Sequence, residues 1–467
     1  MKWKYKALKA NNIFLLLMAA VLLASCKVTE SYKHPSSMVD SKLYRDVNTT
    51  DTSNLGNIPW KKLFTDSLLQ VLIQVGIDHN LDLKIAIARI KQAQANLRQS
   101  KAAFYPTLTV NANIPVENSI KTNNVVITTG LYQLYASAGW EADIWGKLRS
   151  TKRAELAAFM QSEAYRKSVQ TQLVSDIATN YYALMAYDAQ LDVTQKTVQN
   201  RILDVEIMKK LKESDVVTGA GVVQSEANRY SVEVTIPDLK QNIRVTENAL
   251  SILLGRTPGE IDRDRLNNQE AWTDIHTGVT LQLLANLPDV QEAEYQLRYY
   301  TELTNAARAY FYPSLTITAE AGLLNTDLSK LFNPASFFAN IIIGLTQPIF
   351  NHGLNKQRLD VAKAQEEEYL QVFKKTLLNA GEEVSNELYN YQCATDKIIL
   401  REQQIAFLVK AVDFTKELLK YTANTNYTDV LTSEQSLLAA QLSSISDKLQ
   451  QLQAIISLYR SLGGGWK

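Results

Sequence analysis

The sequence carries one pattern twice, and the two copies are separated by 207 residues. The tripeptide Phe-Tyr-Pro ends at Pro106 and again at Pro313, and alternating polar and apolar residues follow each time. The long helical segments further along keep the same separation, because Ile177 and Val384 occupy matching positions of a seven-residue hydrophobic repeat. Two unrelated segments would not share one register over such a distance. The sequence therefore predicts an internal duplication in which strands are inserted between long helices.

Each copy is predicted to contain a pair of strands. The residue before a proline disfavours the helical conformation, and residues 107–114 then alternate strictly, as in a strand with one buried face. We expect hairpins at about 107–143 and 314–347, the first with a loop through Lys121 and Asn124. One face is apolar and the other is polar with little charge, which favours strands of a membrane barrel. A soluble sandwich is the alternative at this point.

Two very long helices are predicted to follow the hairpins. Residues 147–213 contain neither Pro nor Gly, and at 1.5 Å per residue they would form a rod of about 100 Å. Apolar residues recur every seven positions, which implies a left-handed supercoil against neighbouring helices. The expected seams are Ile177, Leu184, Leu191, Val198 and Val205 in the first helix, and Leu370, Leu377, Val384, Tyr391, Ile398, Ile405, Val412 and Leu419 in the second.

Each long helix is predicted to end in a turn and to be followed by a return helix. Gly219 and Gly221 allow the first turn, and Pro237 should kink the return helix over 222–254. These boundaries divide the chain into a first repeat at 60–255, a linking element at 256–287 and a second repeat at 288–467.

The N-terminus is predicted to contain a signal peptide for export and a site for a lipid anchor. In residues 1–25, basic residues precede an apolar run from Ile13 to Leu23 that is too short to span a membrane, as in a secretory signal peptide. Leu23-Ala24-Ser25-Cys26 matches the bacterial lipobox, which implies cleavage before Cys26 and a lipid on its thiol. A plain signal peptide with a chance cysteine is the alternative. Residues 26–59 would then form a lipid-anchored tether.

Composition and motifs argue against several functional classes. The formal net charge is +1, and no basic stripe suggests a nucleic-acid partner. Residues 139–147 resemble a phosphate-binding loop only superficially, because the spacing differs and Leu148 replaces Ser or Thr. The four histidines lack metal-ligand spacing, Cys393 is expected to be packed, and residues 366–368 read as a solvated acidic helix face. We therefore expect no enzyme, no metal and no cofactor apart from the lipid on Cys26.

The strand count suggests an assembly. No later stretch has 18 consecutive apolar residues, so a membrane crossing would require a barrel. Each chain supplies four strands, whose open edges would be unpaired in lipid. A dimer would give eight strands and a filled interior, whereas a trimer would give twelve strands and room for a pore. The trimer is therefore favoured.

Several stretches resemble the TolC/OprM-type outer-membrane efflux channel family, in its lipoprotein branch. The residues that carry the resemblance are Trp60-x-x-Leu63-Phe64, the run from Gly139 to Arg149 (Gly-Trp-Glu-Ala-Asp-Ile-Trp-Gly-Lys-Leu-Arg), Leu253-Leu254-Gly255, and Pro288-Asp289-Val290 with Ala293-Glu294. The resemblance implies a homotrimer with a twelve-stranded outer-membrane barrel that continues as an α-helical barrel across the periplasm.

The same resemblance implies a function and partners. The chain would be a passive exit duct for small molecules, working with a periplasmic adaptor and an inner-membrane pump at the outer-membrane lipid. Two alternatives remain: the exit duct of a protein-secretion system, and a lipid-anchored periplasmic coiled-coil scaffold. Lipidation and the motif from Trp140 to Arg149 favour small-molecule efflux.

The candidate functional residues lie at the two helix tips, which in the family narrow the periplasmic end of the tunnel and contact the adaptor. Thr428 and Thr432 are one helical turn apart and could face the pore. Family members commonly carry Leu-Asp-Ala-Gln where this chain has Leu431-Thr432-Ser433-Glu434, so Asp429 and Glu434 are the nearby acidic substitutes. Ordinary polar turn residues are the alternative reading. The full set is Asp215, Gly219, Gly221, Asn424, Thr428, Asp429, Thr432 and Glu434.

Overall fold

The structure of the chain is a computed structural model. The structure describes residues 28–34, 54–114, 119–122, 125–128, 130–273, 275, 287–421 and 427–467. The predicted signal peptide at 1–25, the lipidation site Cys26, most of the tether and the tip residue Asn424 lie outside the described residues.

The chain forms two compact units, and each contains segments from both predicted repeats. One unit comprises Met1–Pro35, Ile90–Ser162 and Ala293–Phe373, and we call it the sheet unit. The other comprises Ser36–Arg89, Glu163–Glu292 and Lys374–Lys467, and we call it the helical unit. Because each unit draws on both halves of the sequence, neither repeat folds as a separate compact body.

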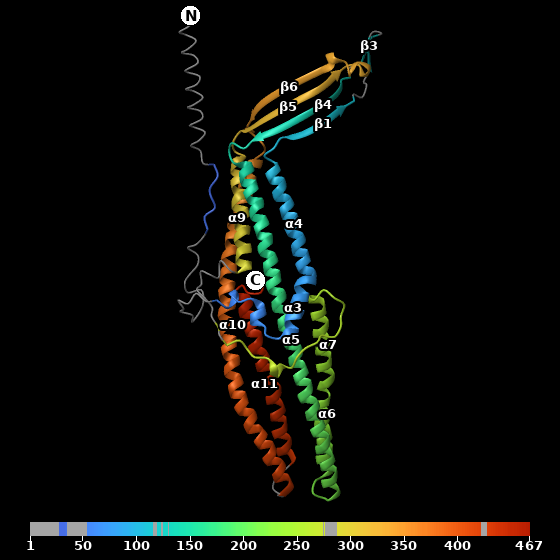
Figure 1. Cartoon of the computed structure of the whole chain (residues 1–467), viewed down its shortest axis with the longest axis vertical. Helices are drawn as coiled ribbons and strands as arrows, with labels where there is room; N and C mark the ends of the chain where they lie inside the picture. The colour runs from blue at the N-terminus through green and yellow to red at the C-terminus, as the bar shows by residue number, and fades with distance from the viewer. Residues whose placement is uncertain are drawn as a thin grey trace. The chain divides into compact units, whose positions relative to one another are not determined.

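The sheet unit contains one four-stranded antiparallel sheet of β1 (Thr107–Asn113), β4 (Tyr132–Ala142), β5 (Ser314–Asn325) and β6 (Phe337–Thr346). The strand order is β1-β4-β5-β6, so the two predicted hairpins join through the pairing of β4 with β5 (Figure 1). The short 3₁₀ helices η4 (Leu328–Lys330) and η5 (Pro334–Ser336) connect β5 to β6. The predicted strand positions are confirmed to within a few residues.

One part of the sequence prediction was wrong. The segment between β1 and β4, predicted as a loop, contains the strands β2 (Ser119–Thr122) and β3 (Val125–Thr128), which pair as a separate antiparallel hairpin. These strands are only four residues long, and strict alternation over such a length is a weak signal. In the sequence, Asn123-Asn124 separates the two strands, and asparagine is favoured in turns. This pair was the sequence feature that could have indicated a hairpin.

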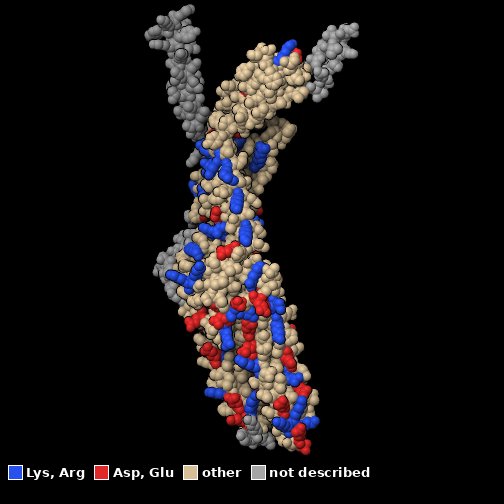
Figure 2. Space-filling model, turned by 45° about the vertical axis from the view of Figure 1, so that its right-hand side comes forward, with Lys and Arg blue, Asp and Glu red and all other residues tan. Residues whose placement is uncertain are grey.

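The two faces of the sheet differ in polarity, as the alternation predicts. Leu108, Val110 and Ile343 on the apolar face are 73%, 74% and 68% exposed. The opposite face carries Thr, Asn, Ser and Gln together with Tyr135, Phe338 and Ile342. Glu141 and Glu320 are the two charged residues of these four strands. Figure 2 shows the sheet surface almost free of charge. A single chain therefore leaves a large apolar sheet surface uncovered.

Long helices begin or end at the foot of the sheet. In chain order these are α4 (Leu81–Ala102), α5 (Lys147–Glu213), α9 (Pro288–Ala309) and α10 (Leu354–Tyr421). Gly146, with φ of 78°, precedes α5, and His352 and Gly353, with φ of 54° and 76°, precede α10. Among the described residues, no helix is long and apolar enough to cross a membrane.

The helical unit is organised around the two predicted seams. Seven of the predicted seam residues are buried: Ile177, Leu184, Val198, Val205, Leu377, Val384 and Val412. The seven-residue repeat is confirmed at these positions, and the other predicted seam residues are half-buried. The remaining helices of this unit are α2 (Trp60–Leu63), α3 (Ser67–His79), α6 (Gly219–Glu233), α7 (Thr235–Leu253) and α11 (Tyr427–Ser461), with the 3₁₀ helices η2 (Leu55–Asn57) and η3 (Leu266–Asn268).

The return helix after the first tip breaks where Pro237 requires it. Proline has no N–H and its ring clashes with the carbonyl four residues earlier, which here belongs to Glu233. α6 ends at Glu233 and α7 begins at Thr235. The predicted kink is therefore a break into two helices.

Candidate functional site

The first helix tip is a tight turn between α5 and α6. Asp215 adopts the left-handed conformation with φ of 53°, and the N–H of Val216 donates to the carbonyl of Leu211 at 2.9 Å. The Thr218 side chain then caps α6 by accepting from the N–H of Gly221. These contacts satisfy polar groups that helix ends leave unpaired.

The two predicted tip glycines differ in what surrounds them. A Cβ atom on Gly221 would lie 3.1 Å from the Cε of Met208, whereas one on Gly219 would lie 3.7 Å from the Cε of Lys212. Gly221 therefore lets α6 approach α5 closely, and Gly219 has more room.

A small apolar core lies beneath the tips. Met208 of α5 packs with Tyr427 and Leu431 of α11, and all three are buried. The Tyr427 and Ser225 hydroxyls form a buried 2.7 Å hydrogen bond that joins α11 to α6. Burial raises the pKa of Tyr427, so its phenol stays neutral. Partly buried side chains complete the core: Leu211, Val217, Val222 and Leu419.

A group of four charges, three of them largely buried and the fourth partly exposed, lies further along the same helices, and we call it the charged cluster. It consists of Arg201 and Asp204 on α5, Lys416 on α10 and Glu434 on α11. Glu434 is 2.6 Å from Arg201 Nη1 and 2.5 Å from Lys416 Nζ, and Lys416 Nζ is 3.6 Å from Asp204. The Arg201 side chain is 2% exposed and that of Glu434 is 10% exposed. Three helices are thus held together by charge in a poorly solvated place.

Burial changes the acid–base behaviour of the charged cluster. Burial, followed by the negative charge of Glu434, raises the pKa of Asp204 to about 6, although Lys416 and Arg201 act against this. Burial also lowers the pKa of Lys416, but the hydrogen bond and charge of Glu434 and the charge of Asp204 outweigh it, so the net pKa is raised. Lys416 stays charged, and Asp204 takes up a proton in mildly acidic solution.

The charged cluster is incompletely hydrogen-bonded. The contact between Arg201 and Glu434 is close, but its geometry does not make a hydrogen bond, and Asp204 Oδ2 has no partner among the described residues. A cavity of about 390 Å³, lined among others by Thr197, Lys416 and Gln441, adjoins the cluster. Buried charges without full partners are costly, so the charged cluster stabilises the packing of these helices less than a fully hydrogen-bonded cluster would.

The predicted acidic residues of the second tip lie in different surroundings. Thr428, Asp429 and Thr432 are exposed, and the Thr432 hydroxyl donates to the carbonyl of Thr428 at 2.8 Å. Glu434, in contrast, points into the charged cluster. The structure does not bring Asp429 and Glu434 together into one acidic site.

Sequence reasoning missed most of the charged cluster. Arg201 lies three residues after the seam residue Val198 and four before Val205, a position of the heptad that usually holds an apolar side chain. That break in the apolar pattern was the available signal. Lys416 on α10 was not predicted, and Glu434 was predicted only as a tip residue, because their pairing depends on how the helices pack.

The described residues contain no group of three or more His, Cys, Asp or Glu side chains that could hold a metal ion. Cys393 is a partly buried free thiol on α10. The structure provides buried contacts between helices and a two-faced sheet.

Comparisons with known proteins agree with this architecture. The family model described as outer membrane efflux protein matches residues 72–256 and 279–464, with one match in each half of the chain. The cation efflux system protein CusC of Escherichia coli O157:H7 is 28% identical over 456 residues, covering 96% of this chain and 97% of CusC.

Further relatives carry other names. The toluene efflux pump outer membrane protein TtgC of Pseudomonas putida is 26% identical, covering 98% of this chain and 96% of TtgC. The probable outer membrane lipoprotein SilC of Salmonella typhimurium is 27% identical, covering 99% of both chains. A crystal structure of CusC matches with a TM-score of 0.84 at 26% identity, covering 94% of this chain and 99% of that one. The chain therefore belongs to the outer membrane efflux protein family, and it is an efflux protein of the bacterial outer membrane.

Proposed function

We propose that three copies of this chain form a channel that is the exit duct of a tripartite efflux system. Small molecules would pass through it passively, after a periplasmic adaptor and an inner-membrane pump have delivered them. The observation that carries the proposal is the four-stranded sheet, which has an exposed apolar face, two unpaired edge strands and long helices at its foot.

The edges of the sheet support closure between chains. β1 and β6 are the edge strands, and an open edge in lipid leaves backbone groups without partners. The four strands alternate in direction, so β6 of one copy and β1 of the next are antiparallel, as β4 and β5 already are. Eight strands from two copies would enclose an interior filled by side chains, whereas twelve strands from three copies would leave a pore.

The two faces of the sheet support the orientation of its strands. The apolar face, with Leu108, Val110 and Ile343, would meet lipid acyl chains, and the polar face would line a wet channel. Glu141 and Glu320 lie on that polar face, where a charge remains hydrated.

We propose that the tips form the periplasmic entrance and contact the adaptor. Asp215, Gly219 and Gly221 would form one part of it, and Asn424, Thr428, Asp429 and Thr432 the other. The hydrogen bond between Tyr427 and Ser225 and the charged cluster around Glu434 would hold α11 against α5 and α6 in the closed state. Opening would exchange these contacts for others.

Lipidation of Cys26 is part of the proposal. It is supported by the sequence Leu23-Ala24-Ser25-Cys26 and by the relative SilC, which is described as a probable outer membrane lipoprotein. The cargo is set by the pump, because the names of similar relatives include both cations and toluene.

Membrane extraction and bilayer recording test the proposal. We expect trimers that dissociate on heating, that stay in the outer-membrane fraction during a carbonate wash, and that conduct ions in planar bilayers. A lipid-anchored scaffold would instead be released when the lipid is removed and would not conduct. Release of Cys26→Ser protein into the soluble fraction, together with absent conductance, would decide for the scaffold.

A further inference from the structure

Each of the four junctions between the sheet and its helices has an exposed aromatic side chain, and we call these four residues the aromatic boundary. Tyr105 precedes β1, Trp140 lies near the end of β4, Phe311 precedes β5, and Phe350 follows β6. They are 74%, 38%, 45% and 80% exposed. Aromatic residues at such positions mark the boundary between acyl chains and headgroups in membrane proteins. The foot of the sheet therefore has the character of a membrane boundary.

Basic residues gather directly beyond this aromatic boundary. In α4, α5, α9 and α10, the two helical turns nearest the sheet contain nine basic residues and one carboxylate, that of Asp360. The basic residues of these turns are Arg98, Lys101, Lys147, Arg149, Lys152, Arg153, Arg308, Lys356 and Arg358. Figure 2 shows Lys and Arg side chains gathered just below the uncharged sheet surface.

Four of these basic residues are already neutralised by ion pairs. The pairs are Lys147 with Glu141, Arg149 with Asp143, Arg153 with Glu302, and Arg308 with Glu30.

The others leave an excess of positive charge. Lys101, Lys152 and Lys356 are exposed, and none of them forms an ion pair with a carboxylate of the described residues. Lys152 Nζ lies 5.8 Å from the centre of the ring of Phe104, the residue before Tyr105. The charge of Lys152 therefore lies close to the aromatic residues at the foot of the sheet. We name Lys101, Lys152 and Lys356 the basic collar.

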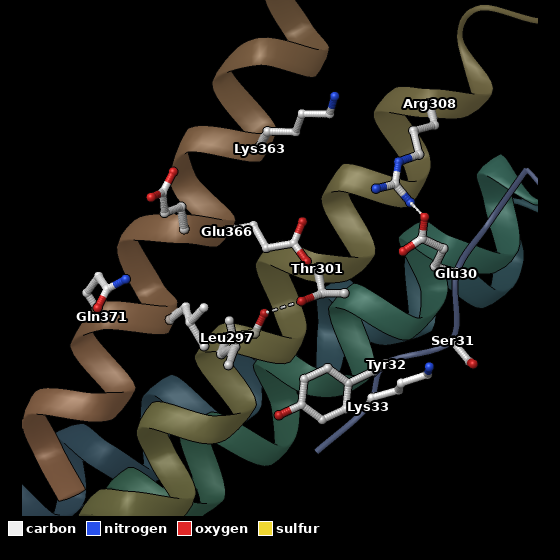
Figure 3. Close-up of a pocket in the computed structure, with 12 residues that line it drawn as sticks. Glu30, Ser31, Tyr32, Lys33, Leu297, Thr301, Arg308, Lys363, Glu366 and Gln371 are labelled. Carbon is white, nitrogen blue, oxygen red and sulfur yellow. Dashed lines mark hydrogen bonds and ion pairs between the residues drawn. The ribbon is translucent and has the colours of Figure 1, made fainter. Parts of the chain in front are cut away.

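A second observation concerns the residues that follow the predicted lipidation site. Residues 28–34, which we call the strap, run along α9 (Figure 3). Buried Asn305 exchanges two hydrogen bonds with the backbone of Glu30, at 2.9 and 2.8 Å, and Glu30 pairs with Arg308 at 2.9 Å. Further along, His34 lies 3.2 Å from Glu294.

The strap limits where an acyl chain on Cys26 can begin. Cys26 is four residues before Glu30, and four extended residues reach at most about 14 Å. The lipid proposed for Cys26 would therefore be attached within this reach of Glu30, which pairs with Arg308 of α9. The strap also borders a groove of about 840 Å³ that Lys363, Glu366 and Gln371 of α10 line (Figure 3).

We propose that the basic collar, with the aromatic boundary above it, binds the headgroups of anionic phospholipid in the periplasmic leaflet of the outer membrane. Phosphatidylglycerol and cardiolipin have the required chemistry, an exposed phosphate charge beside acyl chains that meet Tyr105 and Phe350. The proposal rests on the proposed function for the orientation of the sheet in the membrane. It adds a lipid class that this protein recognises.

The test compares lipid enrichment around wild-type and variant trimers. Full-length protein is reconstituted in phosphatidylcholine bilayers that contain a small fraction of phosphatidylglycerol with brominated acyl chains. Bromine quenches nearby tryptophan, so Trp140 reports enrichment of the anionic lipid. Each basic residue near an anionic surface contributes about a fivefold preference. For Lys101→Gln/Lys152→Gln/Lys356→Gln we therefore expect a loss of preference by a factor on the order of a hundred.

Matched controls make the result specific. Lys240→Gln/Arg244→Gln removes two exposed basic residues of α7 and should leave the quenching unchanged. Inorganic phosphate at matched ionic strength should not compete, and if it does, the basic collar is a site for free phosphate and the lipid proposal is overturned. Equal enrichment around wild type and the triple variant would also overturn it. Heat-labile trimers and conductance are measured on the same samples, so failure of the channel itself is seen separately.

Discussion

Asp204 is the residue of the charged cluster whose ionisation depends most clearly on its surroundings. Its pKa of about 6 lies above the ordinary aspartate value, so the folded protein holds this proton more tightly than the unfolded chain. Its contribution to stability is therefore largest below pH 4 and is lost as the pH rises from about 4 to about 6.

Asp204→Asn should remove this dependence. We expect the difference in thermal midpoint, variant minus wild type, to grow in favour of the variant between pH 4 and pH 6 and to level off above. Circular dichroism melts at several pH values measure it. Asp192→Asn is the control, because Asp192 is exposed and pairs with exposed Lys196 on the same helix. A difference that stays constant over this range would show that Asp204 is not the titrating group.

A substitution of Gly146 by alanine tests how closely the strap packs against the start of α5, because it adds a single methyl group there. The φ of 78° at Gly146 strains any other residue by about 1–2 kcal/mol, and a Cβ atom there would also lie 3.2 Å from Thr29 Cγ2 of the strap. Gly353 has a nearly equal φ of 76°, with nothing within 4 Å of such a Cβ atom. Gly146→Ala should therefore lower the thermal midpoint more than Gly353→Ala and make residues 28–34 more sensitive to protease. Equal effects would mean that Thr29 moves aside without cost.

Some elements of the fold could be predicted from the sequence, whereas others depend on how distant parts of the chain pack together. The seam of α5 was predictable because Ile177 and Leu184 repeat every seven residues without interruption, and the break between α6 and α7 follows from Pro237. The hairpin of β2 and β3 was missed because each strand is too short to show its alternation. The charged cluster was missed because Arg201, Lys416 and Glu434 come from three helices, and packing alone brings them together.

At the scale of paired helices, Glu434 and Asp429 should behave differently. Glu434→Gln leaves Arg201 and Lys416 facing each other with Asp204 as the remaining carboxylate of the charged cluster, and breaking a buried ion pair costs about 3–5 kcal/mol. We expect α11 to loosen and single-channel conductance in planar bilayers to rise. Asp429→Asn removes an exposed charge, so its expected effect is on cation preference, with stability unchanged. If neither variant alters the single-channel records, these residues do not belong to a gate.

For the whole molecule, the proposed trimer and its membrane orientation rest on the two faces of one sheet. Val110 and Asn111 are neighbours on β1, and their side chains point to opposite faces. Val110 is 74% exposed in the single chain, and in the assembled channel that exposure would be to lipid. A Lys facing the middle of the bilayer costs about 2–4 kcal/mol, whereas a Lys facing the channel remains hydrated.

Val110→Lys should therefore reduce the yield of heat-labile trimers in the outer-membrane fraction. Asn111→Lys, which introduces the same charge one residue away, should assemble normally and shift the ion preference of the channel toward anions. The trimers are counted on unheated gels, and the preference is measured as a reversal potential in a salt gradient. Three copies place three such charges around one barrel, so both effects should be large. The reverse outcome, assembly of Val110→Lys and failure of Asn111→Lys, would place the apolar face inside and overturn the orientation.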